Sequence, residues 1–460
     1  MKIQNAVATV GLFASMFRQF FERSRLAAST SVLVGAASLL MAMSGEVYAQ
    51  STFAIINARI ETLADEEPIE RGTLLVRDGK IVAVGKEVEV PIDAAVMDGK
   101  GQTIMPGIVD PYYVVSIGRN TQSAPTRTVV FRGRTFVVGG GAPAIATTFA
   151  KLADGVDLKS VNWESALRCG ITTLNLTTGG FAQSALGEFD AKAADGPLVM
   201  IQNPDGQLLV TVSNETKSLS VLKTGLSKEE SRSARPTGRP SPEQIAAMRA
   251  RSASRGRPSS TSSSSTSKGT ATKEKTAVEK LWDGVKEGKS PLFINADSAS
   301  TLLHVERVAK EQEKAGVVLV ASGPDVYLNL RNLDSKRHHV VLPPRIDLKP
   351  DSRKRINVPA MLDSEDIDFS FSLSLGQSDF RAMQHNPLFA VGMLVRGGLD
   401  RGRALQALTI APAKLLGIEK EVGSLEEGKV ANFIVYDGDP LAATSEIVQV
   451  YSRGERIHGN

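Results

Sequence analysis

Cysteine, histidine and aromatic residues are all scarce in this 460-residue chain. Cys169 is the only cysteine, so the chain can form no internal disulfide bond. It lies at a predicted junction between a helix and a strand, where we expect a small buried side chain. A reactive thiol needs a nearby histidine, which this segment lacks. Aromatic residues make up 5% of the chain, so aliphatic side chains must fill most of its core.

The five histidines are few and scattered, and no two of them form a His-x-His pair. This supply leaves few nitrogen donors for a zinc-type site. We expect His304 on the outer face of a helix and His458 in the C-terminal tail. His338 and His339 precede an apolar run and are predicted at the start of a strand. The fifth, His385, lies close to a predicted strand end.

The N-terminal segment has the three parts of a secretory signal peptide. Basic residues precede an apolar run over residues 26–43, which is followed by Val-Tyr-Ala49. We therefore expect cleavage after Ala49 and export to the periplasm or the extracellular space, as a protein of the cell envelope. The alternative is a retained membrane anchor, since 18 residues are just enough to span a bilayer. No cysteine lies near the cleavage site, which argues against a lipoprotein.

The basic sequence pI of about 9.0 does not describe the folded part of the chain. Residues 226–275 carry 11 Lys or Arg against 4 Asp or Glu, and residues 1–49 carry 4 against 2. Because the total is +4, the remainder has a net charge of −5. A mildly acidic folded part argues against a nucleic-acid-binding protein.

Residues 226–275 are rich in Ser, Arg, Pro and Thr and almost free of large apolar side chains. Such a segment buries too little surface to offset the entropy of ordering, so it is predicted to be a disordered insertion. It is either an inert surface loop or a cationic tether to an anionic partner.

Two kinds of pattern alternate along the rest of the chain. Residues 53–104 have short apolar runs broken by turn signals, and Asp78-Gly79 predicts a hairpin. From about residue 105 to 420, apolar runs alternate with helical ones, which predicts βα units and a parallel sheet. Strands are expected at residues 171–176, 198–201, 292–295, 317–321, 340–342 and 369–375.

The clearest helix is expected over residues 300–314, with Gly316 placed to end it. Its apolar stripe consists of Leu302, Leu303, Val305, Val308 and Ala309.

Motifs near both ends of the chain carry a family resemblance. The first is Asp78-Gly-Lys-Ile-Val-Ala-Val-Gly85, followed by Ile104-Met-Pro-Gly-Ile-Val-Asp110. The later ones are Ala411-Pro-Ala-Lys-Leu-Leu-Gly417, Gly423-Ser-Leu-Glu-Glu-Gly-Lys429 and Asp437-Gly-Asp-Pro440. In this order they resemble the amidohydrolase superfamily, in particular its imidazolonepropionase-like members. One small departure is Ala431-Asn432, where the family usually has Ala-Asp.

The resemblance implies an α/β fold, with a (β/α)8 barrel of the TIM type beside a small β-sandwich. The sandwich is built from N- and C-terminal segments, because each alone has too few strands to bury a face. The predicted parts are a signal peptide at 1–49, sandwich segments at 50–104 and 421–460, and a barrel at 105–420 that contains the insertion 226–275.

The metal ligands of the family are missing from the first barrel strand. The family has Asp-x-His-x-His there, and its histidines hold one or two divalent metal ions, zinc among them. In this register Asp110 is present, but Tyr112 and Val114 replace the histidines. Where relatives have Val-His-Ala, Asn295 replaces a further ligand. A phenol is a poor ligand and an isopropyl group is none, so we expect no metal ion and no other cofactor.

Asp379 keeps a family role by position. It follows the last predicted strand, where the family has an Asp that completes the metal site and moves a proton. Alone it cannot hold a metal tightly, and its alternative role is to cap a helix. The predicted site comprises Asp379 as the catalytic residue and Asp110, Tyr112, Val114, Asn295 and His385 as lining residues.

Three functions remain open for the chain. The first is an exported pseudoenzyme whose barrel binds a small molecule or a partner, such as a related amidohydrolase. The second is an active hydrolase of amides or cyclic imides with a shifted or metal-free site. The third is a structural protein of the cell envelope. We expect membrane contact only if the N-terminal segment is retained.

Overall fold

The computed structural model describes most of the chain after residue 51. The described residues are 52–64, 67–115, 127–131, 134–138, 149–161, 163–190, 198–212, 216–227, 275–296, 298–310, 312, 314–321, 323–349, 352–375 and 388–459. They all belong to the compact unit formed by residues 51–460. The predicted signal peptide and residues 228–274 of the predicted insertion lie outside them. No helix within the described ranges has the length and apolarity to cross a membrane.

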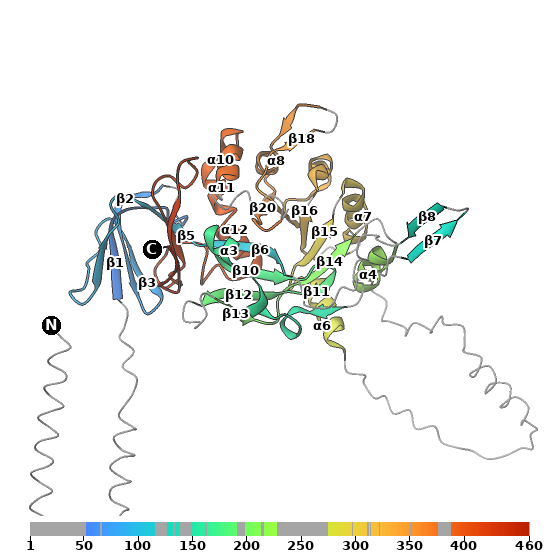
Figure 1. The fold of residues 1–460 in the computed structure, drawn as a ribbon, viewed down its shortest axis with the longest axis horizontal. Helices are drawn as coiled ribbons and strands as arrows, with labels where there is room; N and C mark the ends of the chain where they lie inside the picture. The colour runs from blue at the N-terminus through green and yellow to red at the C-terminus, as the bar shows by residue number, and fades with distance from the viewer. Residues whose placement is uncertain are drawn as a thin grey trace, which may run out of the picture. The chain divides into compact units, whose positions relative to one another are not determined.

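Strands from both ends of the chain form one eight-stranded sheet (Figure 1). Its order is β23-β22-β21-β5-β1-β2-β3, and β4 pairs with β1. The strands are β1 (Thr52–Ile60), β2 (Ile69–Arg77), β3 (Lys80–Gly85), β4 (Ala95–Asp98), β5 (Thr103–Pro106), β21 (Phe433–Tyr436), β22 (Ile447–Ser452) and β23 (Glu455–His458). The predicted pairing of the terminal segments is confirmed, because β5 runs antiparallel to β21. His458 belongs to β23, so its prediction as part of a tail was wrong.

The Asp78-Gly79 turn joins β2 to β3 as predicted. Asp78 has φ 51° and Gly79 has φ 75°, the left-handed values that a type I′ hairpin turn requires at both central positions. A Cβ atom on Gly79 would lie 2.7 Å from the carbonyl oxygen of Arg453. Only glycine therefore fits at this position.

Parallel strands build the barrel. They are β6 (Ile108–Val114), β10 (Ile171–Thr177), β14 (Leu208–Val212), β15 (Leu292–Ala296), β16 (Val317–Ala321), β17 (His338–Leu342) and β20 (Asp368–Phe371). β6 pairs with β10, and β14 to β20 pair in chain order. The predicted fold class, an α/β barrel beside a composite β unit, is confirmed.

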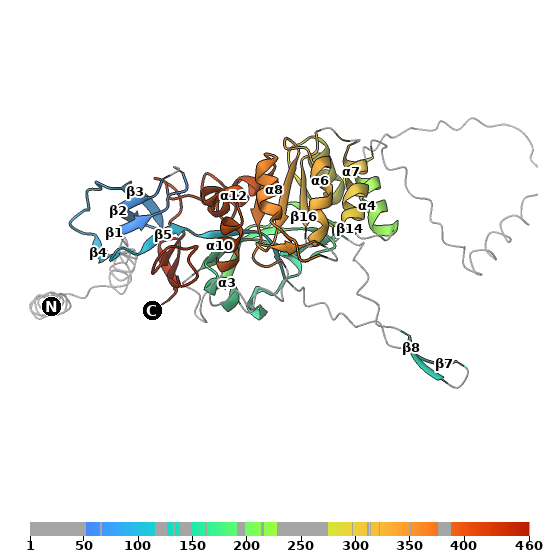
Figure 2. The same cartoon turned by 90° about the horizontal axis from the view of Figure 1, so that it is seen from above.

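Helices cover the outer side of these strands, and α4, α7 and α8 contact β14, β15 and β20 respectively (Figure 2). The helices are α3 (Glu164–Arg168), α4 (Thr216–Leu226), α6 (Ala277–Lys286), α7 (Ala299–Ala309), α8 (Val358–Ser364), α10 (Phe389–Arg396), α11 (Arg401–Gln406) and α12 (Ile410–Leu416), with 3-10 helices η1 (Leu152–Asp154), η2 (Leu158–Ser160) and η3 (Pro324–Asn332). Shorter strands are β7 (Arg127–Phe131), β8 (Arg134–Val138), β9 (Ala150–Lys151), β11 (Phe181–Gln183), β18 (Asp347–Leu348) and β19 (Arg355–Ile356).

Each barrel strand is buried on both faces, which explains its continuous apolar sequence. In β16 all five residues are buried. Val317 and Leu319 pack in the cluster that contains helix residues such as Val305 of α7. Val318 and Val320 face the other way and pack in the barrel interior.

One predicted barrel strand has a different role. The strand predicted at residues 198–201 exists as β13 (Leu198–Asn203), but it runs antiparallel to β12 (Ala185–Asp190), which itself runs antiparallel to β10. No helix separates the two strands among the described residues, and a parallel pair needs a crossover of a dozen or more residues. β12 and β13 therefore extend the sheet of β6 and β10 sideways.

The predicted helix over residues 300–314 is shorter than expected. α7 ends at Ala309, with Lys310 as its C-terminal cap. Leu302, Val305, Val308 and Ala309 are buried as predicted, but Leu303 is 49% exposed. Its assignment to the buried stripe was wrong.

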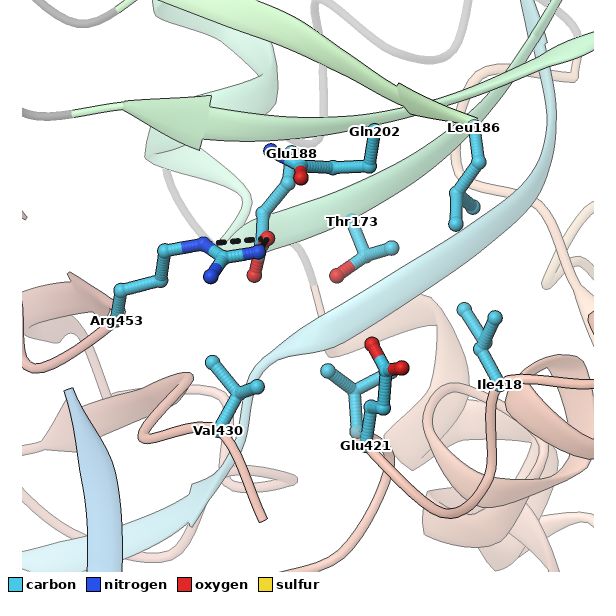
Figure 3. Close-up of a pocket in the computed structure, with 9 residues that line it drawn as sticks. Thr173, Leu186, Glu188, Gln202, Ile418, Glu421, Val430 and Arg453 are labelled. Atoms are coloured by element: carbon cyan, nitrogen blue, oxygen red, sulfur yellow. Dashed lines mark hydrogen bonds and ion pairs between the residues drawn. The ribbon is translucent and has the colours of Figure 1, made fainter. Parts of the chain in front are cut away.

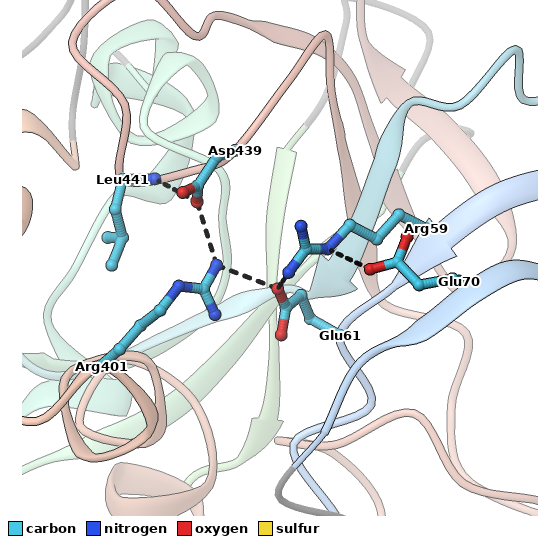
Figure 4. A network of polar contacts seen from close by, with 6 residues as sticks. All are labelled: Arg59, Glu61, Glu70, Arg401, Asp439 and Leu441. Atoms are coloured by element: carbon cyan, nitrogen blue, oxygen red, sulfur yellow. Dashed lines mark hydrogen bonds and ion pairs between the residues drawn. The ribbon is translucent and has the colours of Figure 1, made fainter.

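A network of charges joins the terminal sheet to the barrel (Figure 4). Glu61, at the end of β1, has a side chain that is only 4% exposed, and it accepts hydrogen bonds from Arg59 and Arg401. Arg401 begins α11 and also pairs with Asp439 at 3.0 Å. Burial disfavours the charged form of Arg401, but the two carboxylates outweigh it and raise its pKa.

Candidate functional site

Tyr112 stands at the centre of the barrel interior. It lies on β6 and is 2% exposed. Its hydroxyl oxygen accepts a hydrogen bond from Nδ2 of Asn295 on β15 at 3.0 Å. Burial raises the pKa of Tyr112 to about 12, although hydrogen bonds with Asn295 and Thr211 act in the opposite direction. The phenol therefore stays neutral at physiological pH.

Apolar side chains surround Tyr112. Its cluster consists of Leu209, Phe293, Val318, Val320, Val341 and Leu375, with Val114, Leu415 and Leu416 packed against it. Five of these residues come from the parallel strands β14 to β17 and two from α12, so strand and helix side chains together fill the interior. Val114 was predicted to line the site, and the structure places it beside this cluster.

Asp110 links the first barrel strand, β6, to the segment that follows the last one, β20. It is fully buried, and its two carboxylate oxygens accept hydrogen bonds from the backbone N–H groups of Tyr112 (3.0 Å) and Ser374 (3.1 Å). Burial raises the pKa of Asp110, while the hydrogen bonds from Tyr112, Ser372 and Ser374 lower it. β6 and β20 belong to different sheets, so this side chain supplies a link that backbone pairing does not.

Two serines of the same bridge were missed at the sequence level. Ser372 Oγ and Ser374 Oγ donate to the carbonyl oxygen of Tyr112 at 3.2 and 2.8 Å. The signal was present in Phe369-Ser-Phe-Ser-Leu-Ser-Leu375, where every second residue is a serine. In a strand this alternation places the serines on one face.

The residues at this centre do not fit a catalytic divalent metal ion. Zinc sites use histidine, thiolate or carboxylate ligands, and the positions here hold a neutral phenol, an isopropyl group and an amide. The one carboxylate, Asp110, already accepts two backbone hydrogen bonds. Within the described part of the chain, no three His, Cys, Asp or Glu side chains lie close enough to hold a metal.

Asp379 and His385 lie outside the described residues, so the catalytic role predicted for Asp379 stays a prediction. The structure brings Asp110, Tyr112 and Asn295 together and says nothing of their distance from these two residues.

A small cavity lies at the carboxyl ends of β16 and β17, the barrel face on which enzymes of this architecture build their sites. Its volume is about 10 Å³, and its lining includes Ala321, Gly323, Leu342, Arg345 and Asp347. That is room for about one water molecule. Burial raises the pKa of Asp347, and the adjacent Arg345 partly opposes this effect.

The remaining predicted residues have structural roles. Cys169 is fully buried, as predicted, and burial raises the pKa of its thiol to about 12, which disfavours the reactive thiolate. His338 and His339 begin β17 as predicted. His338 Nε2 lies 2.7 Å from the buried Glu306 carboxylate, and His339 Nε2 lies 2.7 Å from Ser370 Oγ. His304 is exposed on α7, as predicted.

Comparisons with known proteins agree with this architecture. The family model described as "Amidohydrolase family" matches residues 183–457, more than half of the chain. An imidazolonepropionase of Symbiobacterium thermophilum is 26% identical over 403 residues, which cover 82% of this chain and 86% of that protein. An imidazolonepropionase of Klebsiella pneumoniae is 31% identical over 132 residues, which cover 27% of this chain and 32% of the relative.

Among solved structures, an amidohydrolase from Thermotoga maritima has the same fold. The TM-score is 0.62 at 19% sequence identity, and the match covers 89% of this chain and all of the other. At this identity the likeness concerns the fold and not the chemistry.

Proposed function

The chain belongs to the amidohydrolase family, and from this premise we propose that it is an exported member that binds a ligand or partner without hydrolysing it. The observation that carries the proposal is the packing of Tyr112. Its phenol occupies a position where the family has a metal-binding histidine. The phenol oxygen accepts a hydrogen bond from Asn295, and the ring lies among apolar side chains. A packed centre in which a phenol and an amide stand at ligand positions supports a role without hydrolysis.

The expected loss of activity follows from the chemistry of water. A zinc ion lowers the pKa of a bound water from 15.7 to about 7 and so makes hydroxide available at neutral pH. Asp110 cannot replace the metal as a base, because its oxygens accept backbone hydrogen bonds deep in the fold. Hydrolysis would then require another strong nucleophile.

A related amidohydrolase is our proposed partner, and surface chemistry on α7 and η3 supports a protein-facing role. These two elements contact each other. Leu303 of α7 and Leu328 of η3 are 49% and 57% exposed. Large exposed apolar side chains on two elements in contact are the feature on which we base this surface. Export is supported by the signal-like sequence of residues 1–49.

Activity assays separate this proposal from the hydrolase alternative. The mature protein is incubated with N-acyl amino acids and cyclic imides in the presence of zinc or manganese. We expect the native protein and the Asp379→Asn variant to give the same hydrolysis rate as the control without protein. A measurable rate that Asp379→Asn abolishes would establish an active hydrolase in place of the binding protein.

The partner is tested by affinity purification from a cell-envelope extract. We expect a related amidohydrolase to be recovered with the native protein and lost with a Leu303→Lys, Leu328→Lys double variant. Leu348→Lys is the matched control, because Leu348 is 59% exposed on β18, a different element. Equal recovery of the partner with all three proteins would show that Leu303 and Leu328 do not form the binding surface.

A further inference from the structure

A second cavity lies toward the amino end of β10, apart from the carboxyl ends of the strands (Figure 3). Its volume is about 40 Å³. One wall is the sheet of β10, β12 and β13, and the other is the chain that follows α12. The residues that line it are Thr173, Leu186, Glu188, Gln202, Ile418, Glu421, Val422, Val430 and Arg453.

The opposite wall is a closed loop and not a loose segment. The backbone N–H of Val430 donates to the carbonyl oxygen of Glu421 at 2.9 Å, and that of Val422 donates to Ile418 at 3.1 Å. These bonds fix the loop ends, so the cavity has a defined width.

Thr173 is the most informative residue of this cavity. It is 3% exposed, and its hydroxyl has no hydrogen-bond partner in the structure. A buried polar group without a partner is costly, and such groups are rare in folded proteins. Figure 3 shows the carboxylate of Glu421 turned toward Thr173 across the cavity. The Thr173 hydroxyl and the Glu421 carboxylate could therefore both accept hydrogen bonds from a ligand bound between them.

The charges around the cavity favour a cation. Glu188 has a side chain that is 6% exposed, and it pairs with Arg453 at 2.5 Å. Its other carboxylate oxygen accepts from Nδ2 of Asn432. Glu188 and Arg453 therefore balance each other. Glu421 is an exposed residue that adds one negative charge at the rim of the cavity, and among the described residues no Lys or Arg forms an ion pair with it.

The lining distinguishes an ammonium group from a bare metal ion. Calcium and magnesium take six to eight oxygen ligands, whereas Leu186, Ile418, Val422 and Val430 make much of this lining apolar. An alkylammonium has three N–H donors at its head and an apolar stem behind it. A volume of about 40 Å³ holds roughly three water-sized groups, which suits the last two or three heavy atoms of such a chain.

We propose that this cavity binds a primary alkylammonium, with its head between Thr173 Oγ and the Glu421 carboxylate and its stem against Ile418 and Val422. The source is either a small free amine or a lysine side chain of another protein. The site is separate from the barrel centre, so it does not depend on whether the barrel is catalytically silent.

The test is a calorimetric titration of the full mature protein with n-butylammonium chloride. We expect saturable binding that weakens at least tenfold in Thr173→Val and in Glu421→Gln. Glu427→Gln is the matched control, because it removes the same charge from an exposed position of the same loop outside the cavity. Equal affinity in all four proteins, or no saturable binding to the native one, would overturn the proposal.

Further outcomes define the ligand. Tetramethylammonium has no N–H donor and should not compete, and equal binding of tetramethylammonium or potassium would contradict the proposal. A capped lysine that binds at least tenfold more tightly than butylammonium identifies a protein side chain as the source, and equal affinity identifies a free amine. In amine-free buffer, Thr173→Val should raise the melting temperature, because it removes an unpartnered hydroxyl. A lower melting temperature would show that the hydroxyl has a partner.

Discussion

Tyr112 makes two kinds of contact in the barrel interior. Its ring packs among aliphatic side chains, and its hydroxyl reaches Asn295 on β15. We expect Tyr112→Phe to lower the free energy of unfolding by about 1 kcal/mol, the net value of one hydrogen bond. Tyr112→Ala should cost about 3–5 kcal/mol, because it leaves a cavity. Urea unfolding measures both, and equal losses would mean that the ring is not packed.

His339 predicts how stability depends on pH. Burial of its ring, and secondarily the charge of Arg403, lower its pKa to about 3 from a usual 6.5. The unfolded chain therefore binds a proton between pH 6.5 and 3 that the folded protein excludes, so stability falls as the pH drops through this window. When the pH is lowered from 7 to 4.5, the free energy of unfolding of the His339→Gln variant should fall by about 2 kcal/mol less than that of the native protein. Urea unfolding at the two pH values measures both losses, and an equal loss for the native protein and the variant would contradict this prediction.

Asn432 explains one departure from the family sequence. Its amide donates to Glu188 Oε1 at 2.5 Å, and its oxygen accepts from the backbone N–H of Arg453 at 2.8 Å. An Asp here would place two buried carboxylates in contact. We expect Asn432→Asp to cost about 2–4 kcal/mol at neutral pH. Adding Glu188→Gln should recover part of that loss, and a purely additive double variant would show that the two residues are not coupled.

At the level of single elements, α11 depends on β1 through one ion pair. Arg401→Ala removes a partner of the buried Glu61 and of Asp439, so we expect a loss of about 1–3 kcal/mol in unfolding experiments. The control is Arg396→Ala, an exposed arginine near the end of α10, which should change stability by less than about 0.5 kcal/mol. Similar effects of both variants would show that the network does not hold the elements together.

Several elements could be predicted because their signals are local. The apolar run of β16 and the Asp78-Gly79 turn each contain what determines them. β13 has an equally clear apolar run, but its orientation depends on what lies between it and β12. The end of α7 and the exposure of Leu303 depend on which neighbours pack against that helix, which no single sequence reveals.

The site shows the same division. The absence of histidine at positions 112 and 114 was evident from the sequence, and so was the identity of Asn295. The Asn295–Tyr112 hydrogen bond joins residues 183 positions apart, and the role of Asp110 depends on Ser374, 264 positions away. Contacts of this separation follow from how the two sheets of the barrel come together and not from any local pattern.

In the whole molecule, residues that are far apart in the sequence come together in two places, the terminal sheet and the barrel interior. The terminal segments share one sheet, and the barrel interior is closed by side chains from its first strand, its central strands and α12. This packing leaves the centre without the ligands that its family uses for chemistry, which is the basis of the proposed binding role.

Restoring the family motif tests whether the missing histidines suffice to explain this difference. We expect the Tyr112→His, Val114→His double variant to bind zinc weakly at most, because Asn295 still occupies a further ligand position and tight sites need three or four ligands. It should also unfold more readily than the native protein, since it loses the buried ring. Tight zinc binding by this variant, measured by calorimetry, would show that the other ligands are already in place.

The zinc content of the native mature protein tests the central claim most directly. The protein is incubated with excess zinc, dialysed and measured by elemental mass spectrometry. We predict well under one zinc ion per chain, because the barrel centre presents a phenol, an amide and an apolar side chain in place of metal ligands. One tightly held zinc ion per chain, lost in Asp110→Asn or Asp379→Asn, would contradict the account.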